Sequence, residues 1–239
     1  MFYTDIHSHM LFDADDGAKD EAMMYGMLDM AYNSGTRAVC MTPHYHPLYY
    51  GHNQGRSQLS FDLLCAYAKE KYPDMTLAIA NELGYHTDCI LAVERGECRL
   101  LGGKYLLMDF LPTAPLFTVR YGMEEMLAAG YRVVLAHVER YNCLHGQEDL
   151  LADWERRGAL FQVNASAFSR GASFRTRRFV KALMRHALVH AVAADAHDLT
   201  TRPPVLAEAE AVITKNYGED IAKLLLFELP MNLMTGKNF

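Results

Sequence analysis

Short apolar stretches alternate with longer amphipathic ones along nearly the whole chain. The apolar stretches are rich in aliphatic residues, which is typical of strands buried on both faces of a sheet. They cover residues 2–7, 37–41, 75–80, 104–109, 131–136, 159–164 and 189–194. The stretches between them have apolar residues at helical spacing. This pattern predicts helices at residues 20–34, 59–72, 87–95, 123–129, 148–157, 174–185, 204–215 and 220–227.

About seven strands that alternate with helices predict an α/β fold with a parallel sheet. The alternation shows no reversal, which favours a closed barrel. An open, doubly wound sheet is the alternative, but no glycine-rich dinucleotide fingerprint follows any predicted strand. The chain has 239 residues and contains no low-complexity stretch or evident linker. We therefore expect a single domain over residues 1–239.

Metal-ligating residue types stand at the carboxyl ends of most predicted strands, where parallel barrels carry their chemistry. They are His7, His9, His44, Glu82, Asp109, His137, Asp195 and His197, and Asp16 lies on a turn after the first strand. Any single member could be a helix cap or a satisfied polar group. A mixed set of five histidines and four carboxylates, however, suits two or three divalent ions.

The first strand carries the pair His7 and His9 in the sequence Asp-Ile-His-Ser-His. Side chains alternate across a strand, so these two imidazoles point to the same face, about 7 Å apart along the chain. Arg140 follows His137 at the same predicted edge. A guanidinium beside bound cations implies an anion between them, and planar arginine suits phosphate oxygens. A phosphate ester is the expected substrate, and a structural ion pair of Arg140 with Glu139 or Glu148 is the alternative.

Composition limits the possible partners and the compartment. The formal net charge is −6 and no basic block is evident, which argues against a nucleic-acid partner. No apolar run approaches the length of a membrane span, so we expect no membrane insertion. The five cysteines are scattered without a C-x-x-C pair, which favours a reducing cytoplasm.

Two further features invite a functional interpretation. The predicted loop over residues 45–56 contains Tyr45, Tyr49 and Tyr50, which could stack on a substrate ring or simply pack within the loop. Cys89 and Arg95 have the spacing of cysteine-based phosphatases. That loop needs backbone amides wrapped around the phosphate, whereas this stretch has helical character and no glycine. We therefore interpret the Cys89 spacing as coincidental.

Several short motifs together resemble the polymerase and histidinol phosphatase (PHP) family, and more narrowly its bacterial protein-tyrosine phosphatase branch linked to capsule and exopolysaccharide synthesis. The similarity extends from about residue 3 to about residue 235. The motifs are Asp-x-His-x-His at 5–9, Asp-Asp-Gly at 15–17, Thr-Pro-His at 42–44, Asn-Glu-Leu at 81–83, Ala-His-x-Glu-Arg-Tyr at 136–141 and Ala-Asp-Ala-His-Asp at 194–198.

The resemblance implies a distorted seven-stranded TIM-like barrel with up to three metal ions, manganese first, with iron or zinc as alternatives. It implies one ion on His7, His9, Glu82 and Asp195, a second on Glu82, Asp109 and His137, and a third on Asp16, His44 and His197. It also implies Arg140 on the phosphate. Metal chemistry then suggests a metal-bound hydroxide as nucleophile, and Tyr45, from the predicted loop over residues 45–56, is the candidate substrate contact. The expected substrate is a phosphotyrosine protein, in particular a bacterial tyrosine kinase. Asp109 departs from the family pattern, which usually has glutamate there.

Three other functions remain open from the sequence. A histidinol phosphatase shares the metal edge but hydrolyses an alkyl phosphate. A nuclease would need a basic groove that tracks the strand, which the charge does not indicate. A non-catalytic metal-binding protein is possible in principle because Asp109 departs from the pattern.

Overall fold

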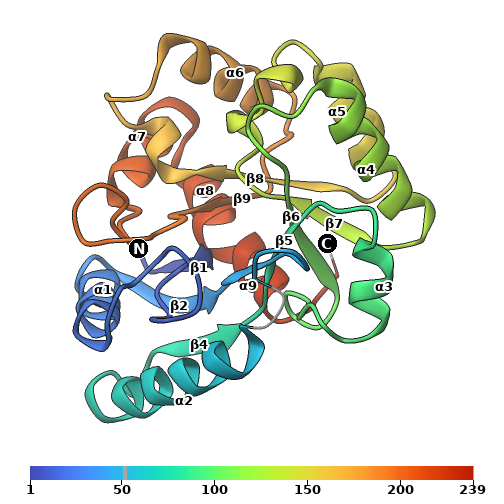
Figure 1. The fold of residues 1–239 in the computed structure, drawn as a ribbon. Coiled ribbons are helices and arrows are strands. Elements are labelled where there is room, and N and C mark those ends of the chain that lie inside the picture. The colour runs from blue at the N-terminus through green and yellow to red at the C-terminus, as the bar shows by residue number, and fades with distance from the viewer. Residues whose placement is uncertain (51–52, 239) are drawn as a thin grey trace.

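The apolar stretches form the strands of a curled, parallel sheet in the computed structural model, which describes residues 1–50 and 53–238. Helices cover the outside of this sheet (Figure 1). The strands are β1 (Tyr3–Ser8), β2 (Thr36–Met41), β3 (His44–Tyr45), β4 (Thr76–Ile79), β5 (Glu82–Gly84), β6 (Tyr105–Asp109), β7 (Arg132–Leu135), β8 (Leu160–Asn164) and β9 (Ala191–Ala193). The α/β class with parallel strands is confirmed.

The strands form two ladders with the orders β1-β2-β4 and β3-β5-β6-β7-β8-β9. Backbone hydrogen bonds connect the ladders where β2 runs into β3 and β4 into β5. The Ala80 amide donates to the Met41 carbonyl at 2.8 Å, and the Glu82 amide donates to the Pro43 carbonyl at 3.2 Å. At the other edge, the Asp195 amide donates to the His7 carbonyl at 2.9 Å. The sheet therefore curls until β1 meets the segment after β9.

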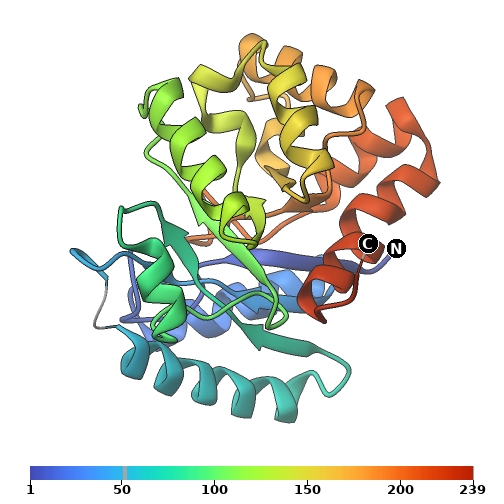
Figure 2. The same cartoon turned by 90° about the vertical axis from the view of Figure 1, so that its right-hand side faces the viewer.

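Nine α-helices occur in the described residues. They are α1 (Glu21–Asn33), α2 (Gln54–Lys71), α3 (Cys89–Glu94), α4 (Leu116–Ala128), α5 (Glu148–Arg156), α6 (Phe174–Arg185), α7 (Ala207–Tyr217), α8 (Glu219–Lys223) and α9 (Leu229–Met234). Helices α1 and α2 lie beside β1, β2 and β4, whereas α4 to α7 lie beside the later strands (Figures 1 and 2). No described helix is both long and apolar enough to cross a membrane.

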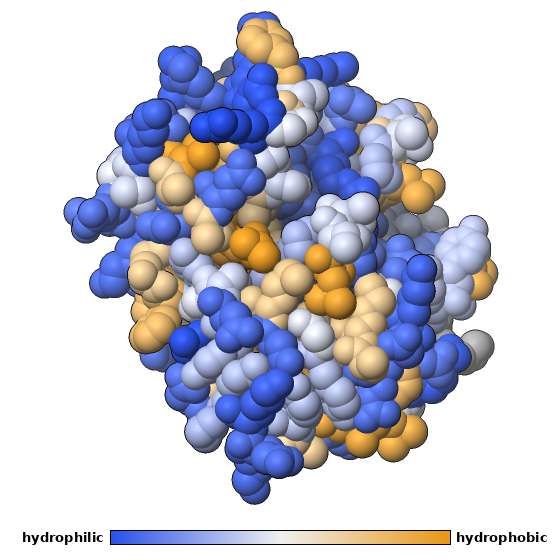
Figure 3. Space-filling model, turned by 90° about the vertical axis from the view of Figure 1, so that its left-hand side faces the viewer, coloured by the Kyte–Doolittle hydropathy of each residue, from blue (hydrophilic) through white to orange (hydrophobic). Residues whose placement is uncertain are grey.

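Alternate residues of each strand pack on opposite sides of the sheet. One cluster fills the inside of the curl with small or narrow side chains such as Ile6, Cys40, Ala80, Val134 and Ala193. The other strand faces pack under the outer helices. The face of the molecule in Figure 3 is mainly hydrophilic, with a few groups of apolar residues near its middle. The core therefore lies on both sides of the sheet, as a doubly covered parallel sheet requires.

Helix α4 starts at Leu116, whereas the sequence analysis predicted a start at Met123. Gly122 is a poor helix former, so the pattern was interpreted as helical only after it. The structure has this glycine inside the helix because a Cβ there would lie 2.8 Å from the rings of both Phe110 and Tyr85. Close packing of α4 on these rings outweighs the low helix propensity of glycine.

The loop predicted over residues 45–56 is also shorter in the structure. Tyr45 belongs to β3 and helix α2 already begins at Gln54, while residues 51 and 52 lie outside the described residues. The buried side chain of Asn53 donates to the carbonyls of Ala14 at 2.7 Å and His44 at 3.0 Å. These two hydrogen bonds fix the start of α2 next to the strand ends.

The last predicted helix extends beyond residue 227. A π-helical segment, Leu224–Glu228, follows α8, and α9 continues to Met234. The prediction stopped before Pro230, but this proline lies in the first turn of α9, where no amide hydrogen bond is lost. Leu233 and Met234 of α9 pack in the cluster that fills the curled sheet.

Candidate metal centre

The structure brings all nine predicted ligand residues together at the carboxyl ends of the strands. Their donor atoms form four overlapping groups, within each of which the atoms lie no more than 4.8 Å apart. The groups are His9-Asp16-His44-His197, His7-His9-Asp195, His7-Glu82-His137 and His44-Glu82-Asp109. Residues from six different strand ends or the loops after them thus share one small volume.

Glu82 lies at the centre of this cluster. Its Oε2 atom is 3.0 Å from Nδ1 of His44 and 3.2 Å from Nε2 of both His7 and His9. Its Oε1 atom is 2.9 Å from Nε2 of His137. Glu82 is buried, and its Oε2 atom accepts no hydrogen bond among the described residues. A buried carboxylate oxygen facing three imidazole nitrogens fits a bridging ligand between cations.

The protonation of the histidines also indicates a site for cations. Burial by itself lowers the pKa of His7, but the carboxylates of Glu82 and Asp195 outweigh burial and raise this pKa to about 9. Burial by itself also lowers the pKa of His9, but the carboxylates of Asp15 and Glu82 outweigh burial and raise this pKa well above its ordinary value. Buried carboxylates require positive charge nearby. When the imidazoles are neutral, as metal ligands must be, bound metal ions would supply that charge.

Side chains around the cluster orient the imidazoles, as is usual around protein metal sites. The sequence analysis named Asp15 only as part of the Asp-Asp-Gly motif and did not single out Gln162. Asp15 contacts Nδ1 of His9 at 2.6 Å and accepts the His44 amide at 2.9 Å. Gln162 contacts Nδ1 of His7 at 3.1 Å and accepts the His137 amide at 2.7 Å. Both leave Nε2 of the histidine that they contact directed into the cluster.

Two of the nine residues have a left-handed backbone. His137 has φ of 30° and Asp195 has φ of 51°. Such conformations cost a residue other than glycine ~1–3 kcal/mol and occur where surrounding structure enforces them. Each of these residues lies two positions after the end of a strand and turns its side chain towards Glu82 or towards His7 and His9. The strain therefore accompanies the placement of ligand-type side chains.

Gly17 fixes the turn that carries Asp16. A Cβ at this position would lie 1.8 Å from the His9 carbonyl oxygen, so the turn packs directly against the end of β1. The amide of Ala18 donates to the same oxygen at 3.1 Å. The carboxylate of Asp16 lies 3.5 Å from Nε2 of His44 and of His197. Only glycine allows this close approach of the turn to the strand.

Asp109 contacts His137 less closely than Glu82 does. Its Oδ1 atom is 3.6 Å from Nε2 of His137, compared with 2.9 Å for Glu82. The same oxygen accepts a hydrogen bond from the Tyr141 hydroxyl at 2.9 Å. Burial, followed by the charge of Glu82, raises the pKa of Asp109. The position at which the family resemblance implies glutamate therefore has a long contact to the histidine of its expected metal site.

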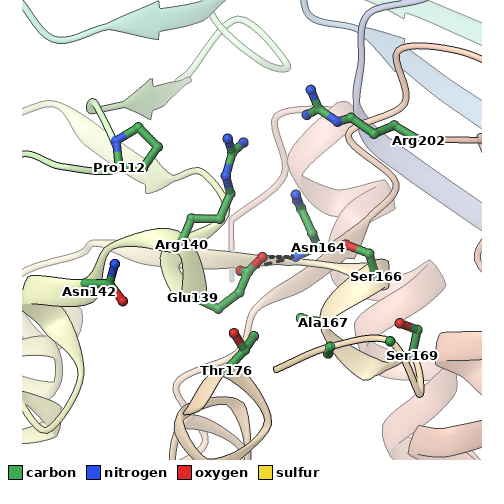
Figure 4. Close-up of a pocket in the computed structure, with 12 residues that line it drawn as sticks. Pro112, Glu139, Arg140, Asn142, Asn164, Ser166, Ala167, Ser169, Thr176 and Arg202 are labelled. Atoms are coloured by element: carbon green, nitrogen blue, oxygen red, sulfur yellow. Dashed lines mark hydrogen bonds between the residues drawn. The ribbon is translucent and has the colours of Figure 1, made fainter. Parts of the chain in front are cut away.

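Arg140 and Arg202 lie at the edge of the cluster and line its cavity, whose volume is about 130 Å³. Nη1 of Arg140 is 3.5 Å from Oδ2 of Asp195, and Arg202 contacts the same oxygen at 2.5 Å. Figure 4 shows the Arg140 guanidinium extending away from Glu139, whose carboxylate accepts the Asn164 amide. No ion pair joins Arg140 to Glu139 or Glu148 in the described structure, so the alternative pairing from the sequence analysis is not observed.

Tyr45 does not reach this cavity, which corrects its assignment as a substrate contact. Its side chain is 1% exposed, and its hydroxyl donates to Glu97 at 2.6 Å. Tyr50 stacks on the ring of His44, with 5.5 Å between the ring centroids. Tyr49 is 77% exposed. Of the three tyrosines in the predicted loop, Tyr49 and Tyr50 are therefore the ones near an open surface.

Cys89 has none of the features of a nucleophilic thiol. It is buried at the start of helix α3, and burial raises its pKa to about 11. A nucleophilic cysteine needs the opposite shift, because the thiolate is the reactive form. This geometry agrees with the interpretation of the Cys89 spacing as coincidental.

Fold and site together define a parallel α/β protein with a dense set of histidine and carboxylate donors at one edge of its sheet. The chain belongs to the CpsB/CapC family of capsular polysaccharide synthesis, whose model matches residues 3–235. The resemblance inferred from the motifs is confirmed at this level.

Curated relatives cover nearly the whole chain. The tyrosine-protein phosphatase CpsB of Streptococcus pneumoniae is 30% identical over 236 residues, which are 96% of this chain and 97% of that protein. The tyrosine-protein phosphatase YwqE of Bacillus subtilis is 28% identical over 224 residues, covering 92% of this chain and 87% of the relative.

Solved structures agree on the fold. The chain resembles one from the structures of YwqE from Bacillus subtilis and CpsB from Streptococcus pneumoniae, described as unique metal-dependent tyrosine phosphatases. The TM-score is 0.86 at 24% identity, covering 99% of this chain and 96% of that one. A phosphotriesterase homology protein from Escherichia coli, with phosphate in its active site, matches with a TM-score of 0.58 at 14% identity and 98% coverage of each chain. Both likenesses concern the fold alone.

Proposed function

We propose that this chain is a metal-dependent protein-tyrosine phosphatase. The observation that carries the proposal is the convergence of eight histidine and carboxylate side chains around a ninth, Glu82, with Arg140 at the edge of the same cavity. This donor set suits divalent ions, and the arginine suits a phosphate oxygen. The names of the curated relatives support the choice of phosphotyrosine as substrate.

We propose three ions, held by the same sets of side chains that the family resemblance implies. The first set is His7, His9, Glu82 and Asp195, the second is Glu82, Asp109 and His137, and the third is Asp16, His44 and His197. The donor groups contain the whole third set and three of the four members of the first set, His7, His9 and Asp195. Glu82 belongs to two further groups, one with His7 and His137 and one with His44 and Asp109, which supports its role as a shared ligand. Nitrogen and oxygen donors without thiolate favour manganese over softer ions, with iron or zinc as alternatives.

When bound, divalent ions lower the pKa of water and neutralise charge on a phosphoryl group. The protein's own residues would orient the substrate. Arg140 is 41% exposed in its side chain and has a single long contact to Asp195, so its remaining donors are available to phosphate oxygens. Arg202 would hold Asp195 in place from the other side of the cavity. A preorganised guanidinium stabilises the charge that develops in the transition state.

The leaving group explains why no strong general acid is needed beside Arg140. A tyrosine phenol has an ordinary pKa of about 10, far below that of an alkyl alcohol. The phenolate can therefore depart with little protonation, whereas an alkyl phosphate requires more help. This reasoning favours phosphotyrosine over histidinol phosphate as the substrate.

We further propose that the curled sheet is a distorted seven-stranded TIM-like barrel and that residues 1–239 form one catalytic domain. Counting β2 with β3 and β4 with β5 gives seven strands, and the bonds between β1 and the segment after β9 support closure. We also propose a cytoplasmic location, supported by five free cysteines, and a bacterial tyrosine kinase of capsule synthesis as the partner protein.

The proposed function is tested by comparing a phosphotyrosine peptide with histidinol phosphate in manganese-supplemented buffer. We expect kcat/KM for the peptide to exceed that for histidinol phosphate by at least roughly 10²-fold, since the alkoxide is the poorer leaving group. A preference for histidinol phosphate would identify an alkyl phosphatase instead. No turnover of either substrate, with metal content verified, would indicate a non-catalytic metal-binding protein.

The long contact between Asp109 and His137 predicts a weak second metal site. Asp109→Glu lengthens the side chain by one carbon–carbon bond towards His137, and metal–oxygen distances tolerate only about 0.2 Å of error. We expect wild-type protein to purify with fewer than three ions per chain and the variant to need less added manganese for full rate. Titration by activity and by elemental analysis measures both quantities. Identical stoichiometry and metal dependence would mean that the backbone of β6 already compensates for the shorter side chain.

A further inference from the structure

Helix α6 carries a concentration of positive charge that the sequence analysis missed when it found no basic block. Five of its twelve residues are basic and none is acidic. Four of them line a groove of about 650 Å³, and we refer to it as the α6 groove. Its lining residues are His145, Gly146, Glu148, Arg175, Arg178, Phe179, Lys181, Ala182, Arg185 and His186. This density is unusual in a chain with a net charge of −6.

Most of this charge has no carboxylate partner in the part of the chain that the structure describes. Among the described residues, no salt bridge connects Arg178, Lys181 or Arg185 to a carboxylate. Glu148 is the one acidic residue that lines the groove. Arg175 donates to Nδ1 of His145 at 3.2 Å and to the Asn142 carbonyl at 3.4 Å, neither of which is an anion. Four cations around a concave surface create a positive potential that attracts anionic ligands.

The α6 groove lies next to a second cavity that opens from the metal centre. This second cavity has a volume of about 700 Å³ and extends from Arg140 and Arg202 to Thr176 at the start of α6 (Figure 4). Asn142 lines it as well, and the Asn142 carbonyl accepts the hydrogen bond from Arg175. Arg175, which lines the α6 groove, and Thr176, which lines the second cavity, are consecutive residues, so the two cavities approach each other at the first turn of α6. A chain segment leaving the metal centre past this turn would reach the basic side of α6.

We propose that the α6 groove binds an acidic or additionally phosphorylated segment of the substrate protein, on one side of the phosphotyrosine held at the metal centre. This inference rests on the proposed function. Arginine forks form bidentate hydrogen bonds with carboxylates and phosphates, and such clusters recognise acidic and phosphorylated motifs in other proteins. The groove would therefore select substrates by the charge of the residues that flank the reacting tyrosine.

The shape of the site favours a peptide over a lipid surface as the anion. The positive side chains line a concave groove on one side of α6, and this groove approaches the cavity next to the metal centre at the first turn of the helix. A membrane would instead contact a broad, convex face with several apolar side chains flanking the charges, whereas Phe174 at the start of α6 is the single strongly exposed apolar side chain of this helix. An extended segment of substrate can pass this turn while its phosphotyrosine occupies the metal centre.

The test uses two peptides of equal length, each with a single phosphotyrosine and flanked on both sides by either acidic or neutral residues. The groove variant is Arg178→Glu combined with Arg185→Glu. The matched control combines Lys69→Glu on α2 with Arg132→Glu at the start of β7, which makes the same change in net charge away from the groove. Turnover of p-nitrophenyl phosphate, measured on each manganese-loaded protein, normalises for the integrity of the metal centre.

We expect the wild-type protein and the control to prefer the acidic peptide by about tenfold in kcat/KM at low salt, because charge complementarity accelerates association. High ionic strength should reduce this preference, and the groove variant should lose it. Equal rates for the two peptides in the wild-type protein, or an unchanged preference in the groove variant, would overturn the proposal.

Two further outcomes separate this proposal from others. The first outcome is that wild-type protein sediments with phosphatidylglycerol vesicles and the groove variant does not, while the groove variant keeps the peptide preference of the wild type. This result would identify the groove as a membrane-binding surface, and the peptide proposal would be wrong. If the manganese-loaded wild-type protein hydrolyses neither peptide nor p-nitrophenyl phosphate, the proposed function itself fails, and the docking role fails with it.

Discussion

Removal of divalent ions should abolish hydrolysis of phosphotyrosine peptides, and added manganese should restore it. Chelation leaves Glu82 buried among imidazoles, with no cation to polarise a phosphoryl group. The loss should be at least roughly 10³-fold in kcat, comparable to the loss of a principal electrostatic contribution in other hydrolytic enzymes. Initial rates before and after dialysis against chelator, with metal content measured on the same samples, provide the test.

Cys89→Ser is the matched control for this prediction. If the chemistry depends on the metal centre, the variant should retain nearly the full rate and the same metal dependence. The thiol is buried in α3, and its raised pKa keeps it protonated near neutral pH. A well-folded Cys89→Ser protein with a large loss of turnover, or a chelated wild-type protein with an unchanged rate, would exclude the metal-centred mechanism.

The positions of the candidate ligands were predictable from the sequence because parallel strands end at one edge of a sheet. A residue directly after an apolar stretch, such as His137 or Asp195, must lie at that edge whatever the strand order. The alternation of side chains along β1 likewise predicted that His7 and His9 converge, and their Nε2 atoms lie 3.2 Å apart. Periodicity and strand ends were sufficient for this part of the site.

Residues that act through tertiary contacts could not be found in the same way. Gln162 lies within β8 and reaches two histidines from other strands, and nothing in its local sequence indicates this role. The start of α4 was missed because Gly122 is needed for close packing against the ring of Phe110, which the local sequence does not indicate. Tyr45 was misassigned because its ring packs in the hydrophobic core and its hydroxyl donates to Glu97, contacts that come from parts of the chain remote in sequence. Arg202 is the exception, since it lies shortly after the last motif and could have been considered beside Arg140.

The basic groove was missed for a different reason. Net charge averages over the whole chain, and a value of −6 conceals a helix with five cations and no carboxylate. Counting charges separately for each predicted helix would have found it. Arg175, Arg178 and Arg185 are spaced by three and by seven residues, which places them on one face of the helix. Charge is informative about partners when it is counted for each element of structure.

Arg140→Ala should lower kcat/KM for phosphotyrosine peptides by roughly 10²-fold while leaving the metal content unchanged. Metal binding should survive because Asp195 does not depend on Arg140 for its position. Its Oδ2 atom accepts hydrogen bonds from Arg202 at 2.5 Å and from Asn164 at 2.8 Å, whereas Arg140 lies 3.5 Å away. Oδ1 of Asp195 remains directed towards His7 and His9.

Two further variants and one assay distinguish transition-state stabilisation from a structural role of Arg140. Arg140→Lys keeps the charge but not the planar fork, so it should recover part of the rate. Arg156→Ala removes an exposed arginine from α5 and should change neither rate nor metal content. Elemental analysis accompanies each rate measurement. If Arg140→Ala lost its metal together with its activity, the arginine would act by holding Asp195, and its proposed contact with phosphate would be wrong.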